Sequence, residues 1–360
     1  MAGLSPRERA ALLAIVAASA LAGIANYGGW AAVPRFALAT VALAGLAWVV
    51  SFATEQLGEH FGPGTTGMLQ STLGNLPELF VVIFALQKGE LVVAQTAIIG
   101  SILANALLVL GLVIVVGAWR APDGVMRFSK RLPRDTATLL QVTVFIIVLL
   151  GLSVSSSDPA SHHVKAISIV GAVCLLLVYL FWVVPYLRAD AAARAQMPPE
   201  QRSAREGPRL SIAASLALLG LSGAGSAFVS DWFVNGLRPA IDQLNLSPAF
   251  AGLVIVAIAG NAVENTVGLV LAWKRRSDLA ISVVKNSVAQ IAAFLFPLLV
   301  LVSLFFDHRL TFVLSPVYIG ALALTAIAVW QITGDGEAAA FEGWALVALY
   351  VVVATFTLYE

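Results

Sequence analysis

GNLPE at residues 74–78 recurs as GNAVE at residues 260–264, and this repeated stretch decides the fold. The two copies are 186 residues apart, counted from Gly74 to Gly260. The same offset carries Ser101 onto Ser287. Each copy lies in a long apolar segment, which is followed by a short polar turn and a second long apolar segment. One such motif alone would be a weak signal, but two in matching contexts at one offset indicate an internal duplication.

The composition around the repeats is that of an integral membrane protein. The chain has 360 residues, of which 59% are hydrophobic and 11% charged, and its mean hydropathy is +0.91. Soluble domains contain about 25% charged residues. The net charge of +1 provides no basic field that would attract nucleic acid, and the single cysteine excludes an internal disulfide. The expected partners are therefore the lipid bilayer and small ions.

Apolar runs of about 20 residues, the length needed to cross a bilayer, predict an all-α polytopic protein. We expect eleven transmembrane helices, at about residues 10–26, 35–58, 64–87, 90–119, 134–153, 163–187, 209–235, 247–273, 277–305, 311–331 and 340–359. Residues 1–33 then hold an extra N-terminal helix, 34–187 the first repeat, 188–208 a basic linker, and 209–360 the second repeat. The repeat offset spans five helices, and an odd number reverses direction, so the second repeat is predicted to be inverted. Inverted repeats with glycine-broken helices are typical of secondary transporters.

The distribution of basic residues predicts the orientation. Most of the 21 Lys and Arg residues lie in the N-terminal segment and in the loops on the same side of the predicted spans. Cytoplasmic loops are enriched in Lys and Arg. We therefore expect a cytoplasmic N-terminus and an external C-terminus, in the cytoplasmic membrane of a bacterium.

Two carboxylates, Glu78 and Glu264, are the predicted centre of the function. A carboxylate inside a membrane is costly unless it binds a cation, pairs or takes a proton. Each glutamate follows an asparagine by three residues, Asn75 or Asn261, which places the pair on one helix face. Two facing carboxylates raise each other's pKa, so they can share protons when empty and release them to a cation. Carboxylate and amide oxygens suit hard cations such as Ca²⁺.

Small and amide residues nearby are expected to support this site. They are Gly74, Gly260, Ser101, Asn105, Asn265, Asn286, Ser287 and Gln290. The glycines allow the backbone to open, while the others complete the ligand shell or simply let the helices pack closely. A further acidic group, Glu55, Glu59 and His60, is either a solvated helix end or a cation-access cluster or pH sensor, since histidine titrates in the physiological range. No cofactor is expected beyond the transported cation.

At these residues the sequence resembles the calcium/cation exchanger superfamily, and within it the cation/proton exchanger branch. The similarity is carried by the segments around GNLPE and GSILAN at 67–111 and around GNAVEN and KNSVAQ at 260–301, and it extends from about residue 40 to the end. The resemblance implies a Ca²⁺/H⁺ antiporter with Glu78 and Glu264 as its acidic ligands. Three residues depart from the family pattern, which has a histidine where this chain has Asn265, a glycine at Asn286 and an apolar residue at Lys285.

Lys285 is the one charged side chain between Leu279 and Leu304, and it leaves a second transport hypothesis open. If its ammonium neutralises Glu264 or Glu78, the site would favour Na⁺, K⁺ or Li⁺ in exchange for protons. The alternative is that Lys285 extends to the membrane surface.

Two other classes are weaker. A passive cation channel also accommodates inverted repeats. An intramembrane serine protease would use GLSG at 220–223, but the four histidines lie at predicted helix ends or loops. We expect a transporter and not an enzyme.

Overall fold

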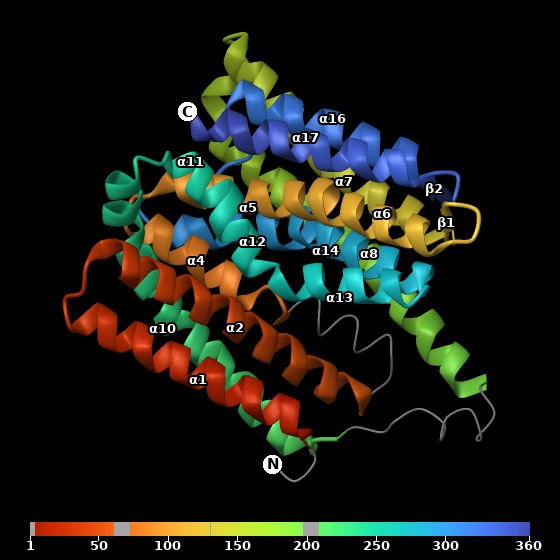
Figure 1. The fold of residues 1–360 in the computed structure, drawn as a ribbon. Helices are drawn as coiled ribbons and strands as arrows, with labels where there is room; N and C mark the ends of the chain where they lie inside the picture. Colours follow the sequence, from red (N-terminus) through yellow and green to blue (C-terminus); the bar gives the residue numbers. More distant parts are fainter. Residues whose placement is uncertain (1–3, 61–72, 130, 197–208) are drawn as a thin grey trace. The chain divides into compact units, whose positions relative to one another are not determined.

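The computed structural model describes residues 4–60, 73–129, 131–196 and 209–360, and helices dominate it (Figure 1). The elements, in which η1, η3 and η4 are π-helical and η2 and η5 are 3₁₀-helical, are α1 (Pro6–Tyr27), α2 (Ala32–Glu59), α4 (Leu76–Gln87), α5 (Leu91–Leu103), η1 (Ala104–Val109), α6 (Leu110–Arg120), β1 (Val125–Arg127), α7 (Arg131–Ser155), η2 (Pro159–His163), α8 (Val164–Gln196), α10 (Ile212–Leu244), α11 (Pro248–Phe250), η3 (Ala251–Val256), α12 (Ala257–Gly260), α13 (Ala262–Trp273), α14 (Ser277–Gln290), η4 (Ile291–Leu295), α15 (Phe296–Val302), η5 (Ser303–Phe305), α16 (Pro316–Thr333), β2 (Glu337–Ala339) and α17 (Ala340–Leu358).

The all-α polytopic class predicted from the sequence is confirmed. Within the described ranges, nine helices are long and apolar enough to cross a membrane, and a tenth span arises if the bent pair Pro248–Gly260 and Asn265–Trp273 counts as one. The expected helix at 64–87 falls partly on residues 64–72, which lie outside the described residues, and its remainder contains α4. The number eleven therefore stays a prediction.

The chain divides into two compact units. Unit 1 comprises Met1–Val81 and Leu180–Leu244, and unit 2 comprises Val82–Tyr179 and Asn245–Glu360. Both predicted repeats contribute to each unit, so the compact units do not follow the repeat boundaries. The division into a first and a second repeat stays a prediction about how the chain is built.

Unit 1 is built around the packing of α2 along α10, with α1 beside them (Figure 1). Phe36 of α2 meets Phe233 of α10 with ring centroids 4.9 Å apart, and Tyr27 meets Trp232 edge-on at 5.8 Å. Helix α1 begins with a capping box, in which Ser5 and Glu8 satisfy each other's backbone N–H groups.

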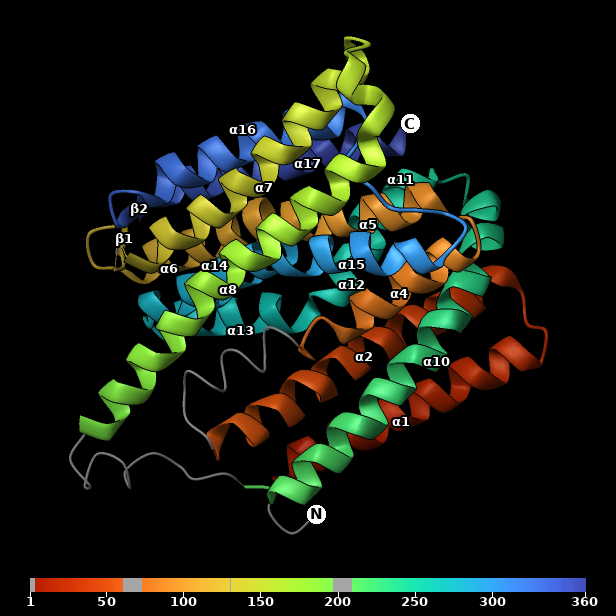
Figure 2. The ribbon, with the colours of Figure 1, turned by 180° about the vertical axis from the view of Figure 1, so that it is seen from behind.

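Unit 2 contains two long continuous spans that run in opposite directions. Leu91–Arg120 is formed by α5, η1 and α6, and Ser277–Phe305 is formed by α14, η4, α15 and η5. The first span ends beside the β1–β2 ribbon, whereas the second begins there, as both views show (Figures 1 and 2). A hydrogen bond of 2.6 Å from the N–H of Ser129 to Oδ1 of Asp278 joins the start of α14 to the chain that follows β1. Because these spans contain the equivalent serines, Ser101 and Ser287, their opposite directions confirm the predicted inversion for this pair.

The π-helical turns η1 and η4 occupy equivalent places in the two spans. The repeat offset carries Ala104–Val109 of η1 onto residues 290–295, and η4 covers Ile291–Leu295. A π-turn replaces the i→i+4 bonding of an α-helix with i→i+5 bonding and is frequent beside functional sites. Here η1 follows Ser101 and contains Asn105, and η4 directly follows Gln290.

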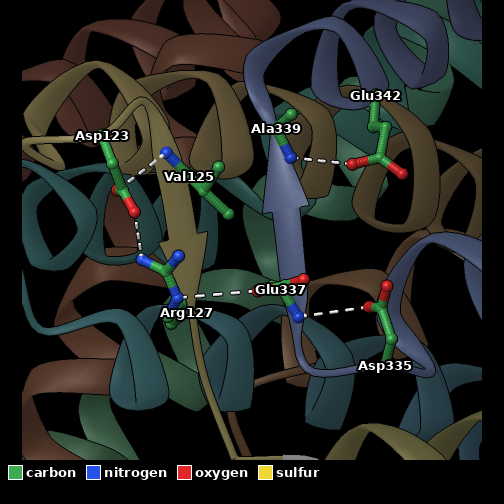
Figure 3. Close-up of polar contacts among 7 residues, drawn as sticks. All are labelled: Asp123, Val125, Arg127, Asp335, Glu337, Ala339 and Glu342. Atoms are coloured by element: carbon green, nitrogen blue, oxygen red, sulfur yellow. Dashed lines mark hydrogen bonds and ion pairs between the residues drawn. The ribbon is translucent and has the colours of Figure 1, made fainter.

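The β1–β2 ribbon, which the sequence did not predict, lies at one end of unit 2 (Figure 1), and Figure 3 shows its polar contacts. The two strands are antiparallel, with Met126 opposite Ala338 and Arg127 opposite Glu337. Arg127 forms ion pairs with Asp123 at 2.6 Å and with Glu337 at 3.5 Å. Gly124 takes a φ of 75° in the turn before β1, a conformation that glycine adopts without strain.

Exposed tryptophans mark the same end of unit 2. Trp119, Trp273 and Trp330 lie in the last turns of α6, α13 and α16, and Trp344 lies near the start of α17; all four are exposed. Tryptophan is enriched at the boundary between hydrocarbon and headgroups. This girdle places the ends of these four helices at one membrane interface.

The predicted linker is partly helical. The sequence placed the end of a helix at residue 187, but α8 continues to Gln196. The alanine-rich segment beyond residue 187 has a high helix propensity, which explains the longer helix. Residues 197–208 of the linker lie outside the described residues.

Candidate cation site

Both GNxxE motifs place their Gly-Asn pair directly before the start of a helix. In the second repeat α12 ends at Gly260 and α13 starts at Ala262, with Asn261 at φ −96° and ψ 18° between them, and the helix bends by 56° here. In the first repeat Gly74 and Asn75 form a turn immediately before α4. That the two glycines open the backbone for ligand carbonyls stays a prediction.

This placement makes each glutamate the third residue of a new helix. Glu78 holds that position in α4 and Glu264 holds it in α13. The first turn of a helix presents unpaired N–H groups and the positive end of the helix dipole, which favour an anionic side chain. Pro77 is the second residue of α4, where a missing N–H costs no hydrogen bond, so it supports the helix start.

The first-repeat residues are buried. Glu78 is 4% and Asn75 is 6% exposed. The carbonyl of Asn75 accepts the N–H of Leu79 at 2.9 Å, which ties the turn to the new helix. The side chain of Glu264 lies outside the described residues, so the predicted pairing of the two carboxylates stays a prediction.

Asn261 is the centre of a buried hydrogen-bond network in unit 2. Its Nδ2 donates to Oγ of Ser101 at 3.0 Å and to the carbonyl of Ala257 at 2.8 Å. Its Oδ1 accepts Nδ2 of Asn105 at 2.6 Å. Nδ2 of Asn105 also donates to the carbonyl of Ser101 at 3.0 Å. The network joins residues of both repeats and shows that Asn261 positions the neighbouring side chains of Ser101 and Asn105.

Among the buried side-chain oxygens of unit 2 that have no hydrogen-bond partner in the described part of the chain, four belong to predicted site residues. They are Oδ1 of Asn105, Oδ1 of Asn265, Oδ1 of Asn286 and Oγ of Ser287. Buried polar atoms normally have a partner, and exceptions call for an explanation. A dehydrated hard cation requires oxygen atoms of this kind, and a ligand role for these four stays a prediction.

Asn265 and Ser287 lie at corresponding levels of the α13–α14 hairpin. The two helices pack antiparallel, and a Cβ on Gly268 would lie 3.0 Å from Cγ2 of Val284. Moving one turn from this contact along each helix reaches Asn265 on α13 and Ser287 on α14. Gln290, one turn beyond Ser287, is 7% exposed. The predicted supporting residues of the second repeat thus gather along one hairpin.

Gly100 serves close helix packing. A Cβ at this position would lie 2.5 Å from Cα of Leu253, so α5 and η3 touch through their backbones. The absence of a side chain at Gly100 therefore allows the close approach of these two helical segments.

Lys285 is 2% exposed, and its ammonium reaches the end of a neighbouring helix. Its Nζ donates to Oγ1 of Thr333 at 2.6 Å. Thr333 is the last residue of α16 and is itself 1% exposed. Sequence reasoning missed Thr333, because a hydroxyl 48 residues away carries no recognisable signal.

The residues of the suspected cation-access cluster have separate surroundings. Nε2 of His60 lies 2.8 Å from the carbonyl of Leu210, and Oε2 of Glu59 accepts Nε2 of Gln56 at 3.3 Å. Oε1 of Gln56 in turn accepts the N–H of Arg209 at 2.9 Å. His60 therefore helps to hold the chain that leads into α10, whereas Glu55 is exposed.

Two further observations concern the protease hypothesis and the binding of a metal ion. Ser222, the serine of GLSG, lies in α10 and donates its hydroxyl to the carbonyl of Leu219 at 3.1 Å, as serines in helices commonly do. Within the described residues, no three His, Cys, Asp or Glu side chains are grouped so that they could hold a metal ion.

Comparison with known proteins gives matches along most of the chain. The model of the sodium/calcium exchanger protein family matches residues 32–186 and 214–359. A vacuolar calcium ion transporter of Schizosaccharomyces pombe is 31% identical over 333 residues, covering 92% of this chain and 80% of the relative. A Ca²⁺/H⁺ antiporter of Synechocystis sp. is 30% identical over 346 residues, covering 92% of each protein. The solved structure of native YfkE is 26% identical with a TM-score of 0.80, covering 97% of this chain and 100% of that one.

Proposed function

Because the chain belongs to the sodium/calcium exchanger protein family, we propose that it is a secondary transporter that exchanges Ca²⁺ for protons across a membrane. The observation that carries this proposal is the equivalent placement of Glu78 and Glu264, each the third residue of a helix that starts at a Gly-Asn break. The chain is not an enzyme, because its relatives are antiporters.

The exchange chemistry follows from the two carboxylates. When no cation is bound, burial disfavours the charged form of each carboxylate and promotes protonation. Arrival of Ca²⁺ displaces these protons, because a divalent charge outcompetes them for the same oxygens. Ca²⁺ takes six to eight oxygen ligands, and amide and hydroxyl oxygens such as those of Asn105 and Ser287 complete the set. The site is electrically neutral only when it holds either the protons or the cation. The transport of protons is therefore coupled to the transport of the cation.

The location of the protein follows in part from the same evidence. The chain is an integral membrane protein, and bacterial relatives are included among its matches. We place it in a bacterial cytoplasmic membrane with its N-terminus in the cytoplasm. The support is the excess of Lys and Arg on one predicted side.

The experiment that tests the function is Ca²⁺ flux into proteoliposomes with an imposed pH gradient. We expect Ca²⁺ uptake to require the gradient, and Glu78→Gln and Glu264→Gln each to abolish it. Glu337→Gln is the matched control, because it removes an exposed carboxylate of the ribbon, and it should leave the flux unchanged.

Two results would refute the proposal. Ca²⁺ uptake that does not depend on the pH gradient would indicate a passive channel. A gradient-driven flux of Na⁺, K⁺ or Li⁺ without Ca²⁺ flux would indicate a monovalent cation/proton antiporter.

A further inference from the structure

The two repeats contain the same turn after their motif helices, α4 and α13. The N–H of Glu90 donates to the carbonyl of Ala85 at 2.8 Å, and the N–H of Arg276 donates to the carbonyl of Leu271 at 2.9 Å. The repeat offset of 186 residues carries the first bond onto the second. Such a bond closes a helix in a Schellman motif, in which the residue before the donor is left-handed. The two turns can therefore be compared position by position.

The left-handed position is a glycine in the first turn and an arginine in the second. Gly89 has a φ of 77°, and Arg275 has a φ of 59°. Glycine adopts this conformation freely, whereas a residue with a Cβ is strained. The guanidinium of Arg275 makes no hydrogen bond or ion pair within the described part of the chain. No contact of this side chain there offsets the strain, which points to a partner outside the chain.

The second turn also carries three positive charges at a membrane interface. Lys88 and Glu90 cancel each other in the first turn, whereas Lys274, Arg275 and Arg276 add up to +3 in the second. The first turn precedes α5, at the end of unit 2 away from the β1–β2 ribbon, and the second precedes α14, beside the ribbon (Figures 1 and 2). The three basic side chains of the second turn are exposed, and they lie at the end marked by the tryptophan girdle.

Arg120 adds a fourth positive charge beside this turn. Its Nε donates to the carbonyl of Trp273 at 3.2 Å, and its guanidinium carbon lies 4.8 Å from the centre of the Trp273 ring. The carboxylate of Asp278, at the start of α14, accepts the N–H of Ser129 at 2.6 Å. Four basic side chains thus gather around the C-terminal end of α13, next to an interfacial tryptophan.

We propose that Arg120, Lys274, Arg275 and Arg276 form a binding site for the headgroup phosphate of an anionic phospholipid. The charge fits, because guanidinium and ammonium groups bind phosphate through charge-assisted hydrogen bonds. The depth fits, because Trp273 marks the level at which lipid headgroups begin. Basic residues beside a transmembrane helix attract anionic lipids in this way. Such a lipid site does not depend on which cation the protein transports.

The test is thermal unfolding of the purified protein in a neutral detergent, titrated with phosphatidylglycerol or with the zwitterionic phosphatidylcholine. We expect phosphatidylglycerol to raise the unfolding temperature of the wild type, and phosphatidylcholine to have a much smaller effect. Each basic residue near anionic lipid strengthens association about fivefold. The half-maximal concentration of phosphatidylglycerol should therefore rise about fivefold in Arg275→Gly and about a hundredfold in the triple variant Lys274→Gln, Arg275→Gly, Arg276→Gln.

Arg275→Gly remains informative if the triple variant fails to fold, because glycine suits the left-handed position. Without lipid, this variant should unfold at a higher temperature than the wild type, since the strain is gone. Arg275→Lys keeps both the charge and the strain, and it should respond to phosphatidylglycerol like the wild type. Lys88→Gln is the matched control, because Lys88 is an exposed lysine of the equivalent turn, and its response should also equal that of the wild type.

Three results would overturn the proposal. The first is a half-maximal concentration of phosphatidylglycerol that is the same in Arg275→Gly or the triple variant as in the wild type. The second is a shift in Lys88→Gln as large as that in Arg275→Gly, which would indicate a general effect of positive charge. The third is stabilisation of the wild type by inorganic phosphate or glycerol 3-phosphate as strong as that by phosphatidylglycerol at the same concentration, because the site would then bind a soluble anion and not a lipid.

Discussion

Asn105 and Asn261, which belong to different repeats, are joined by a buried hydrogen bond of 2.6 Å from Nδ2 of Asn105 to Oδ1 of Asn261. Asn105 is 0% and Asn261 is 1% exposed, so neither side chain can replace this bond with water. This hydrogen bond holds the helix break of the second repeat, at Asn261, against the continuous span of the first repeat, which contains Asn105. It therefore links the geometry of the site to the pairing of the repeats.

Asn105→Leu should destabilise the protein because it leaves Oδ1 of Asn261 buried without its donor. An unsatisfied buried group costs about 1–3 kcal/mol, so we expect a lower unfolding temperature in detergent. Because Asn105 also presents an oxygen to the site, the KM for Ca²⁺ should rise. The double variant with Asn261→Leu should lose less stability than the two single variants added together, since both remove one interaction.

Asn235→Leu is the control for this pair, because Asn235 donates to Asp231 at 3.0 Å on an exposed face of α10. We expect almost no change in its unfolding temperature. Strict additivity of Asn105→Leu and Asn261→Leu would contradict the assigned bond.

Gly100→Ala should impair both folding and transport. The added methyl group would meet the backbone of Leu253, which cannot rotate away as a side chain can, so α5 and η3 must separate. Overpacking of this kind costs about 1–3 kcal/mol. Gly320→Ala in α16 is the control, because nothing lies within 4 Å of the position that its Cβ would take, and replacing a helical glycine by alanine there should raise stability by about 0.5–1 kcal/mol. Equal unfolding temperatures for the two variants would contradict the close approach.

Acidification should loosen the β1–β2 ribbon. The hydrogen bond from the Arg127 guanidinium lowers the pKa of Asp123, and the N–H of Val125 adds to this effect. A lowered pKa in the folded state means that Asp123 contributes stability above its ordinary value of about 3.9, and that this contribution is lost as the pH falls through the lowered pKa.

The measurement for the ribbon is amide hydrogen exchange of residues 121–129, corrected for the intrinsic effect of pH. Faster exchange is expected below about pH 4 in the wild type. Asp123→Asn should show the faster exchange already at pH 7 and little further change on acidification. Identical protection of wild type and variant at pH 7 would show that the ion pair does not hold the ribbon.

His60→Ala and Glu55→Gln should separate a structural role from a cation-access role. His60 contacts the carbonyl of Leu210, so its loss should speed amide exchange at the start of α10 and leave the KM for Ca²⁺ unchanged. Glu55 is exposed, so its loss should raise the KM at low ionic strength only, where surface charges attract ions over longer distances. If His60→Ala raised the KM for Ca²⁺ without changing amide exchange, a cation-access role of His60 would be supported instead.

Much of the architecture could be predicted from the sequence because membrane helices have a strong composition signal. The spans around Ser101 and Ser287 and the helix breaks at Gly74 and Gly260 followed from apolar length and from the repeated motif. The β1–β2 ribbon was missed because each strand has three residues, too few for an alternating pattern. The extension of α8 was missed because a basic segment was interpreted as a linker.

The site itself could be predicted only in part. Residue types and spacing identified Asn261 and Ser101 but not the direction of their hydrogen bonds, which depends on how two distant helices pack. Thr333 was out of reach for the same reason, since its partner Lys285 lies on another helix. A sequence pattern indicates which face of a helix is polar. Which residue contacts that face depends on tertiary packing, which the pattern does not contain.

The matching positions of η1 and η4 bear on the ancestry of the protein. A π-helical turn present in only one of the two repeats would say nothing about their common origin. A turn of the same kind that ends eight residues after the equivalent serine in both halves, Ser101 and Ser287, is most simply inherited from one short gene that was later copied and fused.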